Sequence, residues 1–167
     1  VSLIYATFRS ATPIIYAALC AAITQQADIL NIGTEGIMLT GAFAAVTVSY
    51  LSGSWLLGIL VAMAAGFAMA GIMAVAHIRY KAEICAIGMG INLFALAITK
   101  FMLNVIFETS GTFSDPAISP IPRINLPFLK KISILDQIFN NWTITEWFVI
   151  VLIIIITFVF YKTRWGL

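Results

Sequence analysis

Charged residues are scarce in this chain of 167 residues. They make up 10% of the sequence, against 62% hydrophobic residues, and the mean hydropathy is +1.04. Soluble domains carry about 25% charged residues, so the composition excludes a soluble globular protein and predicts an integral membrane protein in a lipid bilayer. The seven acidic and nine basic side chains are scattered singly or in pairs. Because no run of cations could neutralise several phosphates, we expect no nucleic-acid partner.

Cysteine and histidine are also scarce, and neither forms a metal-binding pattern. Cys20 and Cys85 stand in separate apolar segments without a Cys-x-x-Cys spacing, and His77 is the single histidine. We therefore expect no metal, no disulfide and no cofactor. The sequence also lacks the Gly-x-x-x-x-Gly-Lys-Ser/Thr loop that cradles nucleotide phosphates, so any ATP hydrolysis would belong to a partner.

Long apolar runs are abundant. A helix needs about 20 apolar residues to cross a bilayer, and five segments approach or exceed that length. The sequence thus predicts one all-α polytopic transmembrane domain over residues 1–167, with about five helices. The expected spans are residues 3–24, 29–51, 55–78 and 84–107, and a last one that follows Trp142 and ends near residue 161.

Basic residues predict the orientation. Arg79 with Lys81, and Lys162 with Arg164, flank membrane ends that two crossings separate. The positive-inside rule places both pairs in the cytoplasm. Residues 108–145, which hold all but one of the prolines, are then expected to form an external loop.

The segment 27–39 carries two acids, an amide and two glycines inside otherwise apolar sequence. If residues 29–51 form one helix, Asn31, Glu35 and Met38 fall on a single face. A carboxylate inside a membrane is costly enough to suggest a functional site. These side chains are therefore candidates for a substrate pathway.

Gly33 and Gly36 weaken a helix here, each by about 1 kcal/mol relative to alanine. We expect a broken or re-entrant segment, of the kind that transporters use to hold solutes, and include both glycines in the candidate pathway. The alternative is a water-exposed turn between two spans, in which Glu35 caps the first turn of the second helix.

Two further features lie in the third and fourth expected spans. Asn92 stands about 12 Å along its helix and is a second candidate for the pathway, or else an interhelical hydrogen bond that only holds helices together. Small residues at every fourth position of the third span predict close helix packing. These are Gly58, Ala62, Gly66, Ala70 and Ala74.

Several short motifs resemble, in order and spacing, ABC-transporter permeases of the branched-chain amino acid and ribose class, most closely the nucleoside permeases that work with basic membrane lipoproteins. The motifs are Ala11-Thr12-Pro13, Asn31-Ile32-Gly33-Thr34-Glu35-Gly36-Ile37-Met38-Leu39, Gly41-Ala42-Phe43, Asn92-Leu93 and Thr163-Arg164-Trp165-Gly166-Leu167. Permeases of this kind continue beyond the last motif, so the resemblance covers their N-terminal half.

The resemblance implies a permease subunit of an ATP-driven importer in the bacterial cytoplasmic membrane, with a nucleoside as the expected solute. Its implied partners are a second permease subunit, cytoplasmic ATPase subunits and an extracytoplasmic substrate-binding lipoprotein. Ribose-type sugars or branched-chain amino acids are alternative solutes. The residues also leave open a non-transporting structural subunit, and an intramembrane enzyme using Asp28 or Glu35 with His77 as acid and base.

Overall fold

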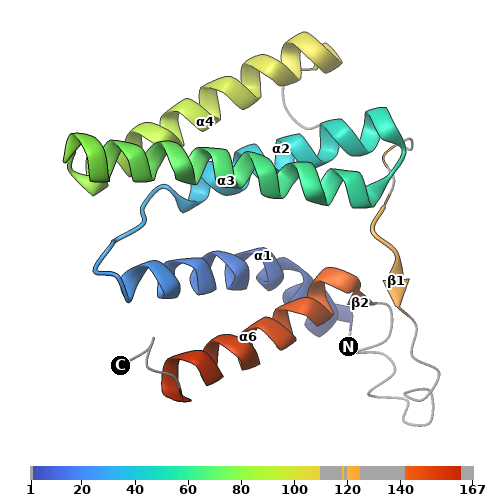
Figure 1. Cartoon of the computed structure of the whole chain (residues 1–167). Coiled ribbons are helices and arrows are strands. Elements are labelled where there is room, and N and C mark those ends of the chain that lie inside the picture. Colours follow the sequence, from blue (N-terminus) through green and yellow to red (C-terminus); the bar gives the residue numbers. More distant parts are fainter. Residues whose placement is uncertain (1, 110–117, 119, 125–141, 163–167) are drawn as a thin grey trace. The chain divides into compact units, whose positions relative to one another are not determined.

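The computed structural model describes residues 2–109, 118, 120–124 and 142–162 (Figure 1). The motif at residues 163–167 and most of the expected external loop lie outside these ranges. The described chain forms two compact units, Val1–Gln26 with Ile121–Leu167 and Ala27–Pro120. The expectations of a single domain and of an external loop remain predictions.

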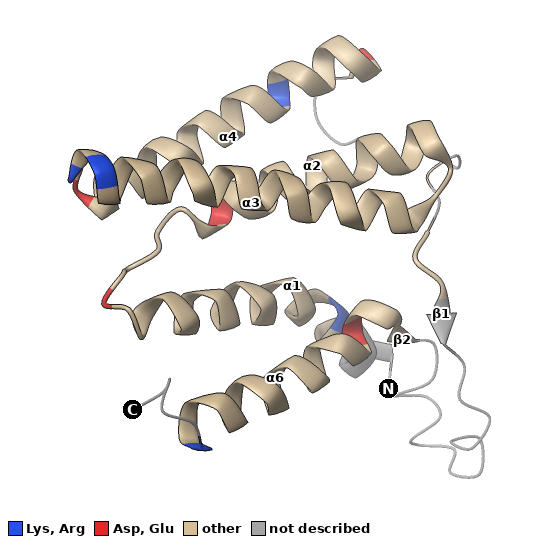
Figure 2. Cartoon of the chain, viewed as in Figure 1, with Lys and Arg blue, Asp and Glu red and all other residues tan. Residues whose placement is uncertain are grey.

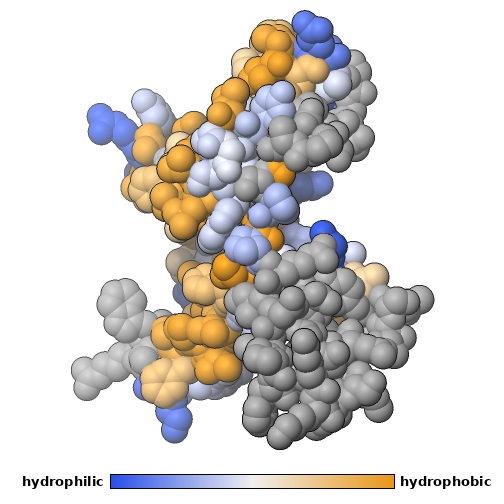
Figure 3. Space-filling model, turned by 90° about the vertical axis from the view of Figure 1, so that its right-hand side faces the viewer, coloured by the Kyte–Doolittle hydropathy of each residue, from blue (hydrophilic) through white to orange (hydrophobic). Residues whose placement is uncertain are grey.

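Within the described ranges, five helices are long and apolar enough to cross a membrane, as the sequence predicted, and the chain is an all-α polytopic membrane protein. Large hydrophobic side chains are exposed on each of these helices, for example Ile14, Leu51 and Phe67. Hydrophobic surface is also extensive in the space-filling view (Figure 3). Such exposed apolar surface is typical of helices that face lipid.

The first unit is formed by two segments, one near each end of the sequence. Its helices are α1 (Ser2–Gln25) and α6 (Ile144–Lys162). The short strand β1 (Arg123–Ile124) pairs antiparallel with β2 (Trp142–Thr143), which leads directly into α6. The Tyr16 hydroxyl donates a hydrogen bond to the Thr145 carbonyl over 2.8 Å, which ties α1 to the start of α6.

The second unit contains α2 (Thr34–Ser52), α3 (Trp55–Tyr80) and α4 (Ile84–Phe107). A tight turn joins α2 to α3, so the two helices lie side by side (Figure 1). Gly53 takes a left-handed φ of 64° in this turn, and its N–H donates to the Ser49 carbonyl over 3.0 Å. Only glycine adopts that conformation without steric cost.

A small buried core lies where α3 meets α4. Met69 and Met73 of α3 pack with Ile91 and Ala95 of α4, and Ile37 from the beginning of α2 packs against them. The core thus fixes the beginning of α2 against α4, which is the region that holds the candidate pathway residues.

Candidate functional site

The chain is not helical between the end of α1 and the beginning of α2, over residues 26–33. Asp28 has a left-handed φ of 58°, and Gly33 occupies the N-cap position of α2. Asn31 therefore precedes the helix, and the expectation that it shares a helical face with Glu35 and Met38 is wrong. The Thr34 hydroxyl donates to the Asn31 carbonyl over 3.0 Å and closes the turn before the helix.

The side-chain amide of Asn92 explains why the helix does not start earlier. In a continuous α-helix the Ile32 carbonyl would accept the N–H of Gly36, four residues later. Here the Ile32 carbonyl accepts Nδ2–H of Asn92 over 3.0 Å, and the Gly36 N–H donates to Oδ1 of Asn92 over 2.7 Å. The amide of α4 is thus inserted between the two groups of one missing helical hydrogen bond.

The same amide caps α2. The first N–H groups of a helix have no partner within it, and at this N-cap Gly33 has no side chain to supply one. Asn92 provides an acceptor from a neighbouring helix. The interhelical role that the sequence left open for Asn92 is therefore present in the structure.

Glycines allow α4 to approach this closely. A Cβ on Gly36 would lie 2.8 Å from both Cα and Oδ1 of Asn92 and 2.9 Å from the Ile91 carbonyl oxygen. One turn earlier in α4, a Cβ on Gly88 would lie 2.9 Å from the Gly33 backbone nitrogen. Gly88 was not among the expected site residues. Its spacing of four from Asn92 on an apolar helix was the signal that could have identified it.

Asn31 has an unsatisfied group. Its Oδ1 is buried and has no hydrogen-bond partner among the described residues. This oxygen lies 3.6 Å from the position that a Cβ on Gly33 would occupy. Buried polar atoms without a partner are uncommon because each costs about 1–3 kcal/mol. The site therefore offers one free acceptor beside the broken segment.

Glu35 and Met38 lie on the first turns of α2 with exposed side chains; Met38 is 39% exposed. Glu35 forms no ion pair within the described part of the chain. Glu35 lies in the first turn of α2, as expected if residues 28–35 form a turn between two spans. A carboxylate in that position interacts favourably with the helix dipole.

The small-residue row of α3 divides into two parts. A Cβ on Gly58 would lie 2.9 Å from the Ala45 carbonyl oxygen, and one on Gly66 would lie 3.6 Å from Cγ2 of Ile37, so this part of the row faces α2. Ala62 is in the same part, since its carbonyl oxygen would lie 3.6 Å from a Cβ on Gly41. Ala70 and Ala74 are exposed.

Among the described residues, no hydrogen bond or ion pair joins His77 to Asp28 or Glu35, the residues considered for acid–base catalysis. Nδ1 of His77 lies 3.0 Å from the Ala82 carbonyl oxygen. A carbonyl only accepts, so Nδ1 donates and the ring is held in the turn after α3. No group of three His, Cys, Asp or Glu side chains that could hold a metal occurs within the described ranges.

Known proteins provide an independent comparison. The guanosine ABC transporter permease protein NupQ of Bacillus subtilis (strain 168) is 34% identical over 169 residues, which cover 97% of this chain and 52% of NupQ. The nucleoside ABC transporter permease protein NupC of Lactococcus lactis subsp. cremoris (strain MG1363) is 30% identical, over 93% of this chain and 50% of NupC.

A putative glucose ABC transporter permease protein, TsgC13 of Haloferax volcanii, is 28% identical over 99% of this chain and 49% of its own length. The chain thus spans about half the length of the curated relatives it matches. No solved structure matches it significantly. The family model described as branched-chain amino acid transport system / permease component matches residues 3–167. The chain therefore belongs to this family of membrane permeases, whose members are transport subunits.

Proposed function

We propose that this chain forms part of the transmembrane pathway of an ATP-driven importer that moves a small polar solute, with a nucleoside as the first candidate, across the bacterial cytoplasmic membrane. The observation that carries the proposal is the break before α2, which Asn92 holds open beside the free Oδ1 of Asn31. Transporters commonly bind solutes and coupling ions at helix termini and at non-helical backbone that lies within the protein. NupQ and NupC, named for guanosine and nucleosides, support the choice of solute.

The two asparagines have different roles in this proposal. Both functional groups of the Asn92 amide are occupied by backbone groups, so Asn92 is a positioning residue. The buried Asn31 oxygen has no partner among the described residues, and in this proposal it accepts a hydrogen bond from a hydroxyl or amino group of the solute once the segment before α2 moves to expose it. An uncharged donor suits this acceptor better than an anion, because an anion would place negative charge beside a carbonyl oxygen.

Glu35, Met38 and the glycines at positions 33 and 36 complete the proposed pathway. The exposed Glu35 carboxylate would contact the solute or a coupled group from the rest of the transporter. Gly33 and Gly36 keep side chains out of the space between the break and α4. Ala70 and Ala74, exposed on α3, would pack against parts of the transporter beyond the described ranges.

The energy would come from other subunits. The partners in this proposal are cytoplasmic ATPase subunits, a second permease subunit and an extracytoplasmic binding lipoprotein that delivers the solute. This division fits the sequence, in which no phosphate-binding loop occurs.

Sugar transport is the second candidate, favoured by the similarity to a putative glucose permease. Sugars also present hydroxyl donors, so the Asn31 acceptor does not separate the two candidates. Transport of branched-chain amino acids and a purely structural role are the remaining candidates. Competition between solutes distinguishes the three transport candidates, and the absence of uptake would indicate the structural role.

Uptake in cells tests the proposal. The gene that encodes this chain would be expressed with its neighbouring transporter genes in cells that lack nucleoside uptake, and accumulation of labelled guanosine measured. We expect uptake that unlabelled nucleosides inhibit and that ribose, glucose and leucine do not. Inhibition by a sugar or by leucine would reassign the solute, and the absence of any uptake would favour the structural role.

Variants then test the site. Asn31→Ala removes the free acceptor, so we expect KM to rise by about fivefold to tenfold, which corresponds to one hydrogen bond of about 1 kcal/mol or slightly more. Asn104→Ala, an exposed amide on α4, is the matched control. Unchanged KM in both variants at equal protein levels would contradict the role of Asn31.

A further inference from the structure

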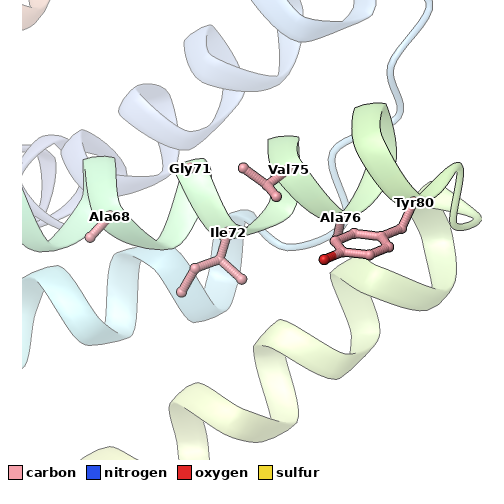
Figure 4. Close-up of a pocket in the computed structure, with 6 residues that line it drawn as sticks. All are labelled: Ala68, Gly71, Ile72, Val75, Ala76 and Tyr80. Atoms are coloured by element: carbon pink, nitrogen blue, oxygen red, sulfur yellow. The ribbon is translucent and has the colours of Figure 1, made fainter.

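A groove runs along the second half of α3, and none of the residues of the break lines it. It has a volume of about 480 Å³. Figure 4 shows two rows of its residues following the helix with a spacing of about four, and the Tyr80 ring closing one end. The lining is almost wholly apolar. The residues are Ala68, Gly71, Ile72, Val75, Ala76 and Tyr80.

The groove ends at two cations. Arg79 follows Val75 by one helical turn, so it extends the row of Gly71 and Val75. Lys81 comes directly after Tyr80, which ends the other row. Figure 2 shows basic and acidic residues gathered at the turn between α3 and α4.

Hydrogen bonds fix the backbone of the turn that carries these cations. The Ala82 N–H donates to the Ala76 carbonyl over 3.3 Å, and His77 donates to the Ala82 carbonyl over 3.0 Å. Lys81 has a left-handed φ of 52°. Neither Arg79 nor Lys81 forms an ion pair in the part of the chain that the structure describes.

The nearby carboxylate is already engaged. Oε1 of Glu83 accepts the Cys85 N–H over 3.1 Å, and Oε2 accepts the Ala86 N–H over 2.9 Å. Glu83 therefore caps α4 and forms no ion pair with Arg79 or Lys81 in the part of the chain that the structure describes. An anion placed between Arg79 and Lys81 would meet two positive charges that form no ion pair in the described part of the chain.

We propose that this groove binds one anionic glycerophospholipid, with the phosphate between Arg79 and Lys81 and an acyl chain along α3. Charge complementarity selects this occupant: unpaired cations at one end suit a phosphate, and the apolar lining suits a hydrocarbon chain. Basic residues at the cytoplasmic ends of helices attract anionic lipids, and the positive-inside rule places this turn on that side.

Native mass spectrometry of the whole chain in detergent tests the headgroup site. Phosphatidylglycerol and phosphatidylcholine with identical acyl chains would be titrated separately, and we expect tighter binding of phosphatidylglycerol. Arg79→Gln and Lys81→Gln should each weaken that binding about fivefold, and the double variant about 25-fold. Lys100→Gln, which removes an exposed cation from α4, is the matched control and should leave it unchanged.

Filling the groove tests the chain site. A Cβ on Gly71 would meet nothing within 4 Å, so Gly71→Leu places a side chain in the groove without a clash and should lower phosphatidylglycerol affinity at least fivefold. Gly90→Leu is the matched control, since Gly90 is equally open and lies on α4. Glycerol phosphate, which has the headgroup without acyl chains, should not compete.

Three results would overturn the proposal. They are equal affinity for both lipids, phosphatidylglycerol binding that is unchanged both in Gly71→Leu and in the double charge variant, and competition by glycerol phosphate. If another protein helix occupies the groove instead, Gly71→Leu would disrupt subunit assembly and leave lipid binding unchanged. This test uses lipid binding alone, so it stands independently of the solute and of transport.

Discussion

Gly36 of α2 donates its backbone N–H to Oδ1 of Asn92 of α4 over 2.7 Å. A Cβ on the glycine would lie 2.8 Å from that same oxygen. The hydrogen bond and the missing side chain are therefore parts of one contact. The amide can reach the helix N-terminus only because position 36 has no side chain, and the amide in turn keeps the break before α2 from closing into helix.

Replacing Asn92 by alanine should open this contact. The Gly36 N–H and the Ile32 carbonyl would both lose their partner, and we expect a loss of about 1–3 kcal/mol of stability. Thermal unfolding in detergent and hydrogen exchange at the Gly36 amide measure the two effects. Asn104→Ala is the control. An amide at Gly36 that stays as protected as in the unmodified chain would contradict the bridging role.

Gly36→Ala should destabilise the second unit by about 1–3 kcal/mol, because the new Cβ would press on the backbone of α4. Gly66→Ala is the matched control, since its Cβ would make an ordinary contact with Ile37 at 3.6 Å. Alanine favours helix over glycine, so the control should be neutral or stabilising by up to about 1 kcal/mol. Equal melting shifts for the two variants would refute the close approach.

Packing between α2 and α3 should depend on the first part of the small-residue row. Gly58→Leu would push against the Ala45 carbonyl and separate the helices, at a cost of about 1–3 kcal/mol. Ala70→Leu adds a side chain at an exposed position of the same helix and should change stability by less than about 0.5 kcal/mol. Thermal unfolding of both variants gives the comparison. A larger loss of stability in Ala70→Leu than in Gly58→Leu would contradict the placement of the α2 contact in the part of the row that holds Gly58.

The Glu83 cap should make α4 sensitive to acid. Hydrogen bonds from the Cys85 side chain and from the backbone N–H groups of Ala86 and Cys85 lower the pKa of this carboxyl. The folded state thus binds the proton less readily than the unfolded state. Its contribution to stability is present above the unfolded pKa and is lost as the pH falls through the folded pKa.

Glu83→Gln measures this effect. The stability difference between the unmodified chain and the variant should be largest at neutral pH and should shrink as the carboxyl becomes protonated. Thermal unfolding between pH 7 and about pH 3 follows it. Because other carboxylates also titrate in this range, Glu108→Gln, an exposed acid at the end of α4, is the control. A difference independent of pH would show that the charge contributes nothing.

The sequence by itself determined the class of protein and most of the helices. Apolar runs of bilayer length leave the backbone no alternative to internal hydrogen bonds, so helices follow directly from composition. The fourth helix was expected at residues 84–107 and spans Ile84–Phe107, and the others differ by a few residues at their ends. Glycines and polar residues at 27–39 indicated an interruption of the helices; residues 26–33 are non-helical, whereas residues 34–39 lie in α2.

Only the tertiary structure decided where the break lies and what holds it. Asn31 precedes the helix instead of sharing its face with Glu35, because an amide 60 residues away from Ile32 takes the carbonyl that would have extended α2. The spacing of Gly88 and Asn92 places them on one face of α4, but it does not indicate which segment that face contacts. Contacts between distant segments depend on how helices cross, and helical periodicity within one segment carries no information about that crossing.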